Sequence, residues 1–403
     1  MEKKTVRDLP DAAYTGKRVL VRVDFNVPIE GGRVADDTRI RESLPSLRYL
    51  AERGAHIVLT SHLGRPKGKW TDAFSLEPVS ARLRELFDAP VAFVRDIVGP
   101  DAHAAVDRLA DGGALLLENV RFLPGEETND AKLSEQLAAF GDVYVNDAFG
   151  TAHRAHASTC GVPEVMKAEG RPAVAGLLIE KELRFLGRAL DQPERPFIAI
   201  LGGAKISGKI DVIEALLPRV DRLLIGGAMA NTFFRALGLE TGRSLVEEAR
   251  VDMARTLLER AGEKLVLPVD CVVAEEPTAG APTRQVARDD VPADMSVLDI
   301  GPKTVATFGE LIASARTVLW NGPMGLFEIE AFAEGTQGIA RAVANATTKG
   351  AVTIAGGGDT AAALEVAGVA NRLSHVSTGG GASLEFLEGR TLPGIAVLDD
   401  QES

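Results

Sequence analysis

The sequence predicts an α/β protein made of two Rossmann-like domains, each a parallel sheet flanked by helices. The chain has 403 residues, which is too long for one ordinary core, so two domains of roughly 200 residues each are expected. Short apolar runs alternate with segments of helical period along the whole chain, a pattern typical of parallel strands joined by right-handed crossovers. Aromatic residues are sparse at 5%, while small and aliphatic residues are abundant, as in buried parallel strands covered by helices.

The candidate strands are short apolar runs, and most of the functional motifs begin just after one of them. Ligands bind beyond the carboxyl ends of the strands in open α/β sheets, so these motifs are candidate site residues. Segments with a 3.6-residue period, such as residues 130–140 and 209–217, lie between the runs. The predicted strands cover residues 18–23, 56–60, 114–117 and 142–146 in the first half, and 197–201, 222–225, 264–267, 317–320, 351–355 and 375–377 in the second.

A helical segment at residues 176–190 separates the two halves. Pro193 and Pro196 follow it and stop the helix before the next strand begins. The predicted domains are therefore residues 1–174 and 191–390, with residues 175–190 between them. The segment is either a semi-rigid hinge or an ordinary crossover helix, and the residues alone leave both interpretations open.

Charge and cysteine content narrow the function classes. The net charge of −12 argues against general nucleic-acid binding, which needs a basic face. An acidic protein that binds an anion must concentrate positive charge locally. Cys160 and Cys271 lie far apart, so a reducing compartment and buried, inert thiols are expected. The charged N-terminus lacks an apolar signal-peptide core, and no run reaches the ~18 apolar residues of a membrane span, which predicts a cytoplasmic protein with no membrane partner.

The second half carries glycine-rich loops suited to a nucleotide. Gly203 to Lys209 satisfies the GxxxxGK part of a P-loop, but Ile210 stands where Ser or Thr would bind magnesium, which makes a true P-loop enzyme the weaker interpretation. Lys205 and Lys209 would still place two ammonium groups at a helix start, where phosphates bind. The alternative is a plain strand-to-helix turn with solvated lysines.

Further loops of this half repeat the pattern after other strands. Gly357, Gly358, Asp359 and Thr360 precede a helical segment, and Asp359 is placed to hold magnesium together with phosphate oxygens. Gly379, Gly380 and Gly381 would offer free amides as an anion hole. Each loop alone could be a capped helix start or a tight turn. Other candidates are Pro323 and Leu326 as walls for adenine, Glu328 for ribose hydroxyls, and Gly226, Gly227 and Ala228 as space for a flat base.

The first half spreads polar and cationic residues over the ends of four predicted strands. Arginine grips phosphate or carboxylate with a planar fork of donors, so this half suits a small anion. A lone arginine is usually a solvated or ion-paired surface residue, but repetition after four strands weakens that alternative. His62, His153 and His156 raise the question of a phosphohistidine, yet nothing in the sequence positions a base beside them. The residues are Arg22, Asp24 and Asn26, then His62 and Arg65, then Arg121, and finally His153, Arg154 and His156.

Taken together, these motifs resemble the phosphoglycerate kinase family, bacterial members in particular. They occur in the family's order and cover nearly the whole chain. The segments are Val23-Asp24-Phe25-Asn26-Val27-Pro28, Asp37-Thr38-Arg39-Ile40, Ser61-His62-Leu63-Gly64-Arg65-Pro66, Glu118-Asn119-Val120-Arg121-Phe122, residues 148–156, residues 201–209, residues 321–328, residues 356–360 and residues 377–383.

The resemblance implies reversible phosphoryl transfer from 1,3-bisphosphoglycerate to ADP, giving 3-phosphoglycerate and ATP, with Mg²⁺ on the nucleotide and no covalent phosphoenzyme. It also implies a monomer whose two lobes close around a hinge that includes a helix like residues 176–190, and a final segment, residues 391–403, that packs on the first domain. The glycerate would be bound by Asp24, Asn26, Arg39, His62, Arg65, Arg121 and Arg154. The nucleotide would be bound by Gly203, Ala204, Lys205, Pro323, Glu328, Gly357, Gly358, Asp359 and Thr360, with Asp359 on Mg²⁺. Arg39, Lys209, Gly379, Gly380 and Gly381 would stabilise the phosphoryl group in flight.

Two other function classes fit the sequence less well. An NAD-dependent dehydrogenase should show GxGxxG after a first strand, and Gly202-Gly203-Ala204 does not fit that pattern. A non-catalytic nucleotide-binding protein would not need the set of arginines in the first half.

Overall fold

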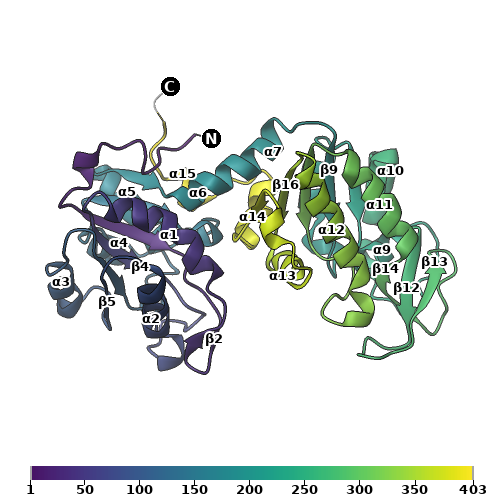
Figure 1. The fold of residues 1–403 in the computed structure, drawn as a ribbon, viewed down its shortest axis with the longest axis horizontal. Helices are drawn as coiled ribbons and strands as arrows, with labels where there is room; N and C mark the ends of the chain where they lie inside the picture. Colours follow the sequence, from purple (N-terminus) through teal and green to yellow (C-terminus); the bar gives the residue numbers. More distant parts are fainter. Residues whose placement is uncertain (1, 402–403) are drawn as a thin grey trace. The chain divides into compact units, whose positions relative to one another are not determined.

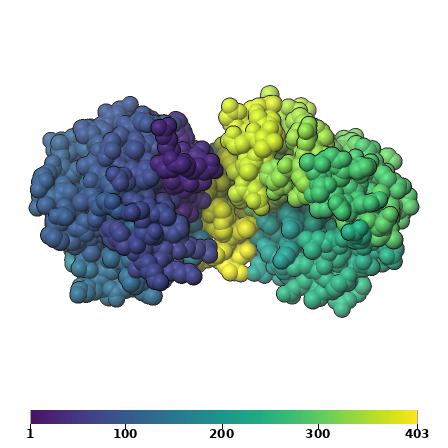
Figure 2. All heavy atoms as spheres, turned by 90° about the horizontal axis from the view of Figure 1, so that it is seen from below, coloured from purple at the N-terminus to yellow at the C-terminus, as the bar shows by residue number. Residues whose placement is uncertain are grey.

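The computed structural model describes residues 2–401, and they form two compact units. Unit 1 contains the chain up to Arg184 together with the segment that begins at Thr391, and unit 2 contains Phe185–Arg390. In the space-filling view the colours from purple to blue belong to unit 1, and those from teal through green to lime belong to unit 2 (Figure 2). Each unit is built around its own parallel sheet (Figure 1).

The sheet of unit 1 has the strand order β5-β6-β4-β1-β7-β8, and every pair in it is parallel. β1 lies between β4 and β7, so Val21 pairs with Leu59 on one side and Val145 on the other. Both faces of β1 are buried, which explains its mostly apolar sequence, although it begins with Arg18 and contains the fully buried Arg22. The bounds are β1 Arg18–Val23, β4 His56–Thr60, β5 Val91–Val94, β6 Ala114–Leu117, β7 Val143–Asp147 and β8 Ala173–Ala175.

Helices cover this sheet, and α1 and α2 supply much of one core face. Leu47 of α1 and Leu83 of α2 pack with Val21 and Leu59 of the sheet. A short hairpin, β2 Ile29–Glu30 with β3 Arg33–Val34, precedes α1. The helices are α1 Thr38–Ala51, α2 Glu77–Leu86, α3 Pro100–Val106, α4 Ala131–Ala138 and α5 Val162–Ala168.

The helical segment predicted at residues 176–190 is present but is not uniform. It consists of α6 (Leu177–Glu182), a π-helical stretch at Leu183–Gly187, and α7 (Arg188–Asp191). The division between the units, after Arg184, falls inside the π-helical stretch. Such stretches are rare and often mark functional positions. Its role as a hinge stays a prediction.

The C-terminal segment packs on unit 1. Asn146, at the end of β7, donates from Nδ2 to the carbonyl of Gly394 at 2.8 Å, next to α15 (Pro393–Ala396). Leu398 is fully buried, and Lys3 Nζ donates to its carbonyl at 2.9 Å. The segment therefore fills part of the core of unit 1.

The sheet of unit 2 has the order β11-β10-β9-β15-β16-β17, again parallel throughout. One core face is filled by α11 and α12, whose Phe308 and Val343 pack with Ile200 and Trp320. Figure 1 shows these two helices lying along the sheet. The strands are β9 Phe197–Leu201, β10 Arg222–Ile225, β11 Leu265–Val266, β15 Thr317–Asn321, β16 Val352–Gly356 and β17 His375–Val376, and the helices are α8 Ile210–Leu216, α9 Met229–Ala236, α10 Val251–Ala261, α11 Pro302–Ser314, α12 Glu334–Thr348, α13 Gly358–Val366 and α14 Gly381–Leu387.

Unit 2 also contains an antiparallel sheet, which the sequence pattern did not predict. Its order is β13-β12-β14, with bounds Arg284–Ala287, Asp270–Ala274 and Ser296–Ile300. Buried Asp270 ties it to α11, because its Oδ1 accepts the amide of Thr304 at 2.7 Å. The predicted strands of both parallel sheets are confirmed, with ends shifted by one residue in β7, β11, β15, β16 and β17, whereas β5 and β8 were missed.

Both cysteines are free and buried, as predicted. Burial raises the pKa of the Cys160 thiol to about 11 and that of Cys271 to about 12, so both are protonated at neutral pH. Among residues 2–401, no helix combines the length and the apolar content that a membrane span requires.

We predict that Leu398→Ala destabilises unit 1 by about 2–5 kcal/mol, because it leaves a cavity at a fully buried position. Hydrogen exchange resolved by unit should show faster exchange in the strands of unit 1. Val366→Ala, at an exposed position on α13, is the control and should change neither unit. Equal protection of β8 in Leu398→Ala and the unaltered chain would contradict the prediction.

Candidate functional site

In unit 1 the predicted site residues follow strands that are neighbours in the sheet. Asp24 and Asn26 follow β1, His62 and Arg65 follow β4, and the segment with Arg121 follows β6. Arg154 follows β7, and Arg39 is the second residue of α1. Because β6, β4, β1 and β7 are consecutive in a parallel sheet, their carboxyl ends meet along one edge.

Asp24 holds Arg39. An Nη1 donor of Arg39 bonds to Asp24 Oδ2, and the Asp24 carboxylate is nearly buried. A Cβ on Gly150 would lie 2.4 Å from that carboxylate oxygen, so glycine is needed there for the loop after β7 to approach. About a third of the Arg39 side chain is exposed, which leaves the rest of its donor fork available to a ligand.

His62 is buried beside these charges. Its Nδ1 lies 3.2 Å from Nη2 of Arg22 and 3.9 Å from Asp24 Oδ1. Burial, followed by the positive charges of Arg22, Arg121 and Arg39, lowers the pKa of His62 well below its usual value. His62 is therefore neutral at pH 7 and acts through hydrogen bonds.

Arg22 forms a support that the sequence did not assign to the site. It is fully buried, and its Nε donates to Ser158 Oγ at 2.7 Å. Ser158 in turn donates from Oγ to Glu126 Oε1 at 2.6 Å and from its amide to Oε2 at 2.9 Å. Glu126 is also fully buried, so the guanidinium and the carboxylate are joined through one hydroxyl. A buried arginine requires such partners.

Asn26 and Arg121 both bind the backbone of the loop after β4. Asn26 Oδ1 accepts the amide of Gly64 at 2.8 Å, and Arg121 Nη1 donates to the carbonyl of the same residue at 2.8 Å. Burial and the charge of Arg22 lower the pKa of Arg121. Arg65 follows Gly64 directly and is exposed.

The loop after β7 extends the positive region. Arg154 donates from Nε to His153 Nε2 at 3.1 Å. Burial and the charges of Arg121, Arg22 and Arg154 lower the pKa of His156 to about 3, although Glu126 Oε1 lies 3.7 Å from its Nδ1. The positive charges of arginines from several strands and loops thus lower the pKa values of the same two buried histidines, His62 and His156. This part of unit 1 can bind a small, multiply charged anion.

In unit 2 the glycine loops after β9, β10 and β15 interlock. The amide of Gly203 donates to the carbonyl of Pro323 at 3.0 Å, and that of Gly227 donates to Met324 at 2.9 Å. Gly227 has φ +67°, and a Cβ there would lie 2.5 Å from the Gly203 nitrogen. The backbones can approach this closely only without side chains.

These loops border a cavity of ≈ 470 Å³, within the size range of small-molecule sites. Eight predicted nucleotide residues line it: Gly203, Ala204, Gly227, Ala228, Pro323, Leu326, Glu328 and Asp359. The sequence missed a second set of lining residues, which come from the loop before α10, a loop after β12 and the antiparallel strand β14: Arg243, Leu245, Pro277, Ser296, Val297 and Leu298. Lys205 lies next to Ala204 in the chain. The apolar walls and acidic rim suit a flat base attached to a hydroxylated sugar.

Lys209 lies between carboxylates and an amide oxygen. Its Nζ donates to Asn321 Oδ1, at the end of β15. Burial lowers the pKa of Lys209 to about 8, partly offset by the charges of Asp359 and Glu388. Burial disfavours the charged form of the lysine, so a phosphate close to the ammonium would stabilise that charge.

Asp359 and Thr360 stand in the first turn of α13. Asp359 is exposed, while Thr360 is buried and its Oγ1 accepts the amide of Gly322 at 2.7 Å. Gly357 has φ +97°, and Asn321 Nδ2 donates to the carbonyl of Gly356 at 2.8 Å. Thr360 and Asn321 therefore brace the loop, and Gly358 is exposed beside Asp359.

The glycine triplet before α14 differs from its prediction in one respect. The amide of Gly379 donates to Ser377 Oγ at 3.2 Å, so it is not free as expected. Gly380 has φ +54°, and α14 begins at Gly381. The Gly379 amide is therefore not available as a donor to an anion at this turn.

The described residues offer few side chains that could coordinate a divalent cation. Within residues 2–401, no group of three or more His, Cys, Asp or Glu side chains is placed to hold a metal ion. Asp359 and Glu328 are the carboxylates that line the cavity. The donor set therefore fits Mg²⁺ that arrives with phosphate oxygens, its usual companions.

Comparisons with known proteins agree along the chain. Residues 9–390 match the family model described as phosphoglycerate kinase. The phosphoglycerate kinase of Chloroflexus aurantiacus is 57% identical over 408 residues, covering 100% of both chains. That of Chlorobium chlorochromatii is 56% identical over 404 residues, covering 99% of this chain and 100% of the relative.

Solved structures show the same fold. The phosphoglycerate kinase structure from Coxiella burnetii superposes with a TM-score of 0.86 at 42% identity, and covers 98% of each chain. The one from Pyrococcus horikoshii reaches a TM-score of 0.85 at 32% identity over 98% of each chain. The chain belongs to the phosphoglycerate kinase family.

Proposed function

We propose that the chain is an enzyme that reversibly transfers a phosphoryl group from 1,3-bisphosphoglycerate to ADP, giving 3-phosphoglycerate and ATP in glycolysis. One structural observation supports the proposal in addition to family membership. The cationic cluster of unit 1 and the glycine-lined cavity of unit 2 both stand at the carboxyl ends of neighbouring parallel strands. One suits a small anion and the other a nucleotide, as a kinase for a small acid requires.

The glycerate would bind in unit 1 through Arg39, Arg65, Arg121 and Arg154. Charge-assisted bonds from several arginines hold both the carboxylate and the phosphate of the substrate. Asp24 and Asn26 would accept the substrate hydroxyl, and Asp24 also orients Arg39. His62 is supported as a neutral hydrogen-bonding group, because its pKa is depressed by burial and by Arg22.

The nucleotide would bind in unit 2. Gly203, Ala204 and Pro323 would flank adenine, Glu328 would accept ribose hydroxyls, and Lys205 would neutralise phosphates. Gly357, Gly358 and Thr360 would place the phosphate chain near the start of α13. Mg²⁺, held by Asp359 and phosphate oxygens, would neutralise charge on the transferring group.

The reaction needs charge stabilisation more than proton transfer. In the forward direction a β-phosphate oxygen of ADP bonds to phosphorus, the bond from phosphorus to the acyl oxygen breaks, and the glycerate carboxylate leaves. Nucleophile and leaving group are both ionised at pH 7, so no general base is required. Arg39, Lys209 and the amides of Gly380 and Gly381 would stabilise the charge in flight, whereas the Gly379 amide already donates to Ser377.

Several further parts of the proposal follow from this chemistry or from the resemblance. Direct transfer requires the two bound substrates to meet, and closure of the two units, with residues 176–190 as hinge, would bring this about and exclude water. On the same basis we propose that the enzyme is monomeric and cytoplasmic, and that it binds neither nucleic acid nor membranes.

A coupled assay that follows ATP-dependent consumption of 3-phosphoglycerate tests the function directly. Activity that requires Mg²⁺ and both substrates is expected. Nucleotide binding without turnover would instead support the non-catalytic alternative.

We predict that Arg39→Ala lowers kcat by on the order of 10²-fold or more, because a charge contact to the transferring group is lost. Calorimetry should show nearly unaltered ADP affinity. Arg48→Ala on the same helix removes an exposed ion pair with Asp88 and an exposed bond to the Leu86 carbonyl, and it is the matched control. An unchanged turnover number in Arg39→Ala would remove Arg39 from the mechanism.

We predict that kcat/KM for the nucleotide falls as the pH rises above about 8, the pKa of Lys209. Lysine carries its charge below its pKa, so raising the pH removes the ammonium that meets the phosphates. Lys209→Arg should have lower activity but no such decline, because guanidinium stays charged. Identical pH profiles for the two proteins would rule out Lys209 as the titrating group.

A further inference from the structure

The loop between β15 and α12 carries much of the wall of the nucleotide cavity in unit 2. This base loop, residues 322–333, contributes Pro323, Leu326 and Glu328 to the lining. On one side it is held by the glycine loops after β9 and β10, whose amides donate to the carbonyls of Pro323 and Met324. Its other side is bonded to β14 of the antiparallel sheet, through groups that have been assigned to neither substrate.

β14 departs from regular pairing where it meets the base loop. Its register with β12 shifts between Val272 and Val273, so that the pairing skips Leu298. This is a β-bulge, a feature that is common next to active sites. The carbonyl of Leu298 accepts the amide of Leu326 at 2.9 Å, and the bulge thereby joins the sheet to the wall of the cavity.

Asp299 follows the bulge, and its buried carboxylate lies between the base loop and the start of α12. Oδ2 accepts the amide of Gly335 at 2.7 Å, and Oδ1 accepts the amide of Ile300 at 2.8 Å. A Cβ on Gly325 or on Gly335 would lie 2.1 Å from Oδ1. Glycine is therefore required at both positions for the base loop and α12 to close on the carboxylate.

The contact with α12 reaches the base loop through the next residue. Thr336 follows Gly335 in the first turn of α12 and is fully buried. Its Oγ1 accepts the amides of Met324 at 3.0 Å and Gly325 at 3.2 Å. By fixing the start of α12, Asp299 therefore also fixes the segment of the base loop between its two apolar wall residues.

Asp299 lies directly behind the wall of the nucleotide cavity. It borders a small cavity of ≈ 10 Å³, and three lining residues of this small cavity also line the nucleotide cavity: Gly227, Val297 and Leu298. A side chain in this place acts on a bound nucleotide through the backbone that it holds.

The carboxylate is unfavourable at this position, which argues that its two bonds matter. Burial, partly offset by the amides of Gly335 and Ile300, raises the pKa of Asp299 to about 7, and the charge of Glu334 adds to the rise. Asparagine would avoid the buried charge. It has one acceptor oxygen, however, and its Nδ2 would face a backbone N–H, donor against donor.

We propose that Asp299 is a positioning residue of the nucleotide site. By holding the base loop and the start of α12, it fixes the wall against which the base packs, and so sets the affinity for ADP and ATP. This inference rests on the proposed function, because it assumes that the cavity receives a nucleotide.

Asp299→Asn tests the proposal, with ADP as the probe. Calorimetry on the full chain, above pH 7 where the carboxylate is ionised, should show a Kd for ADP raised on the order of tenfold, because one amide bond is lost and the wall relaxes. In the coupled assay the KM for ATP should rise similarly, while kcat and the KM for 3-phosphoglycerate stay within about twofold, as expected when only ground-state binding is lost.

Asp270→Asn is the matched control. Asp270 is a buried aspartate of the same antiparallel sheet, and it also accepts two backbone amides, from Lys303 at 3.0 Å and from Thr304 at 2.7 Å. It fixes the start of α11 instead of α12, so its variant should lose stability without a change in ADP affinity. Thermal unfolding compares the stabilities of the two variants.

Thr336→Val gives a second, independent measurement. It replaces the hydroxyl that accepts the amides of Met324 and Gly325 with a methyl group of similar size. ADP affinity should fall in this variant as well, so the proposal stays testable if Asp299→Asn does not fold.

Three results would overturn the role of Asp299. The first is unchanged ADP affinity in the folded Asp299→Asn and Thr336→Val variants. The second is an equal loss of affinity in Asp270→Asn, which would make the effect one of stability. The third is a fall in kcat with an unchanged KM for ATP. An unaltered chain that does not bind ADP would refute the nucleotide site itself, and the inference with it, whereas binding without turnover would leave the calorimetric test intact.

Discussion

Both faces of the parallel strands are buried, and this restricts where polar functional side chains can lie in this protein. β1 and β9 are mostly apolar because helices cover each side of their sheets. Most polar site residues therefore lie at the strand ends or in the loops beyond them, with the buried Arg22 of β1 as an exception, and parallel strands place those loops along one edge. The same constraint produces a cationic cluster in unit 1 and a glycine-lined cavity in unit 2. The contrast between them lies in the loops, which carry arginines in one unit and glycines in the other.

Placing several arginines close together in unit 1 is electrostatically unfavourable, and the partners of the buried side chains offset this cost. Arg22 is fully buried and reaches Glu126 through the hydroxyl of Ser158. His62 remains neutral because it is buried and because protonation would add a charge next to Arg22. Asp24 fixes one side of Arg39. Partnered charges of this kind keep their geometry without a ligand, and preorganised donors stabilise developing charge better than mobile ones. Removing one partner would leave a buried charge uncompensated.

The parts predicted from the sequence are those that depend on local patterns. β1, β4, β6, β9 and β10 have the predicted bounds, because short, mostly apolar runs between polar loops are typical of strands in a parallel sheet. β14 was missed because the buried Asp299 interrupts its apolar pattern, whereas β12 was missed although the buried Asp270 stands only at its first residue. The sequence could not predict that Arg22 supports the site from within β1, because its partner Ser158 lies 136 residues away. The π-helical turn at residues 183–187 has no recognised sequence signal.

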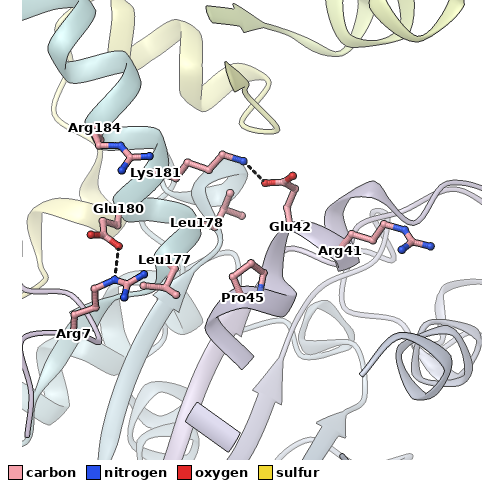
Figure 3. A pocket seen from close by; sticks show the side chains of 9 residues that line it. All are labelled: Arg7, Arg41, Glu42, Pro45, Leu177, Leu178, Glu180, Lys181 and Arg184. Atoms are coloured by element: carbon pink, nitrogen blue, oxygen red, sulfur yellow. Dashed lines mark hydrogen bonds and ion pairs between the residues drawn. The ribbon is translucent and has the colours of Figure 1, made fainter. Parts of the chain in front are cut away.

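The ion pairs of unit 1 differ in burial, and so in how firmly they hold their charges. Around Arg22 the charged partners are buried, so exchanging one of them would be costly. Around Lys181 and Arg7 the ion pairs, which Figure 3 draws as dashed lines, are exposed and contribute little to stability. The buried arrangement favours the fixed geometry that catalysis needs. The start of α6 is also firmly held, because its first two amides donate to Ser46 and Asp147, whereas the pair Lys181–Glu42 joins α6 to α1 by an exposed contact.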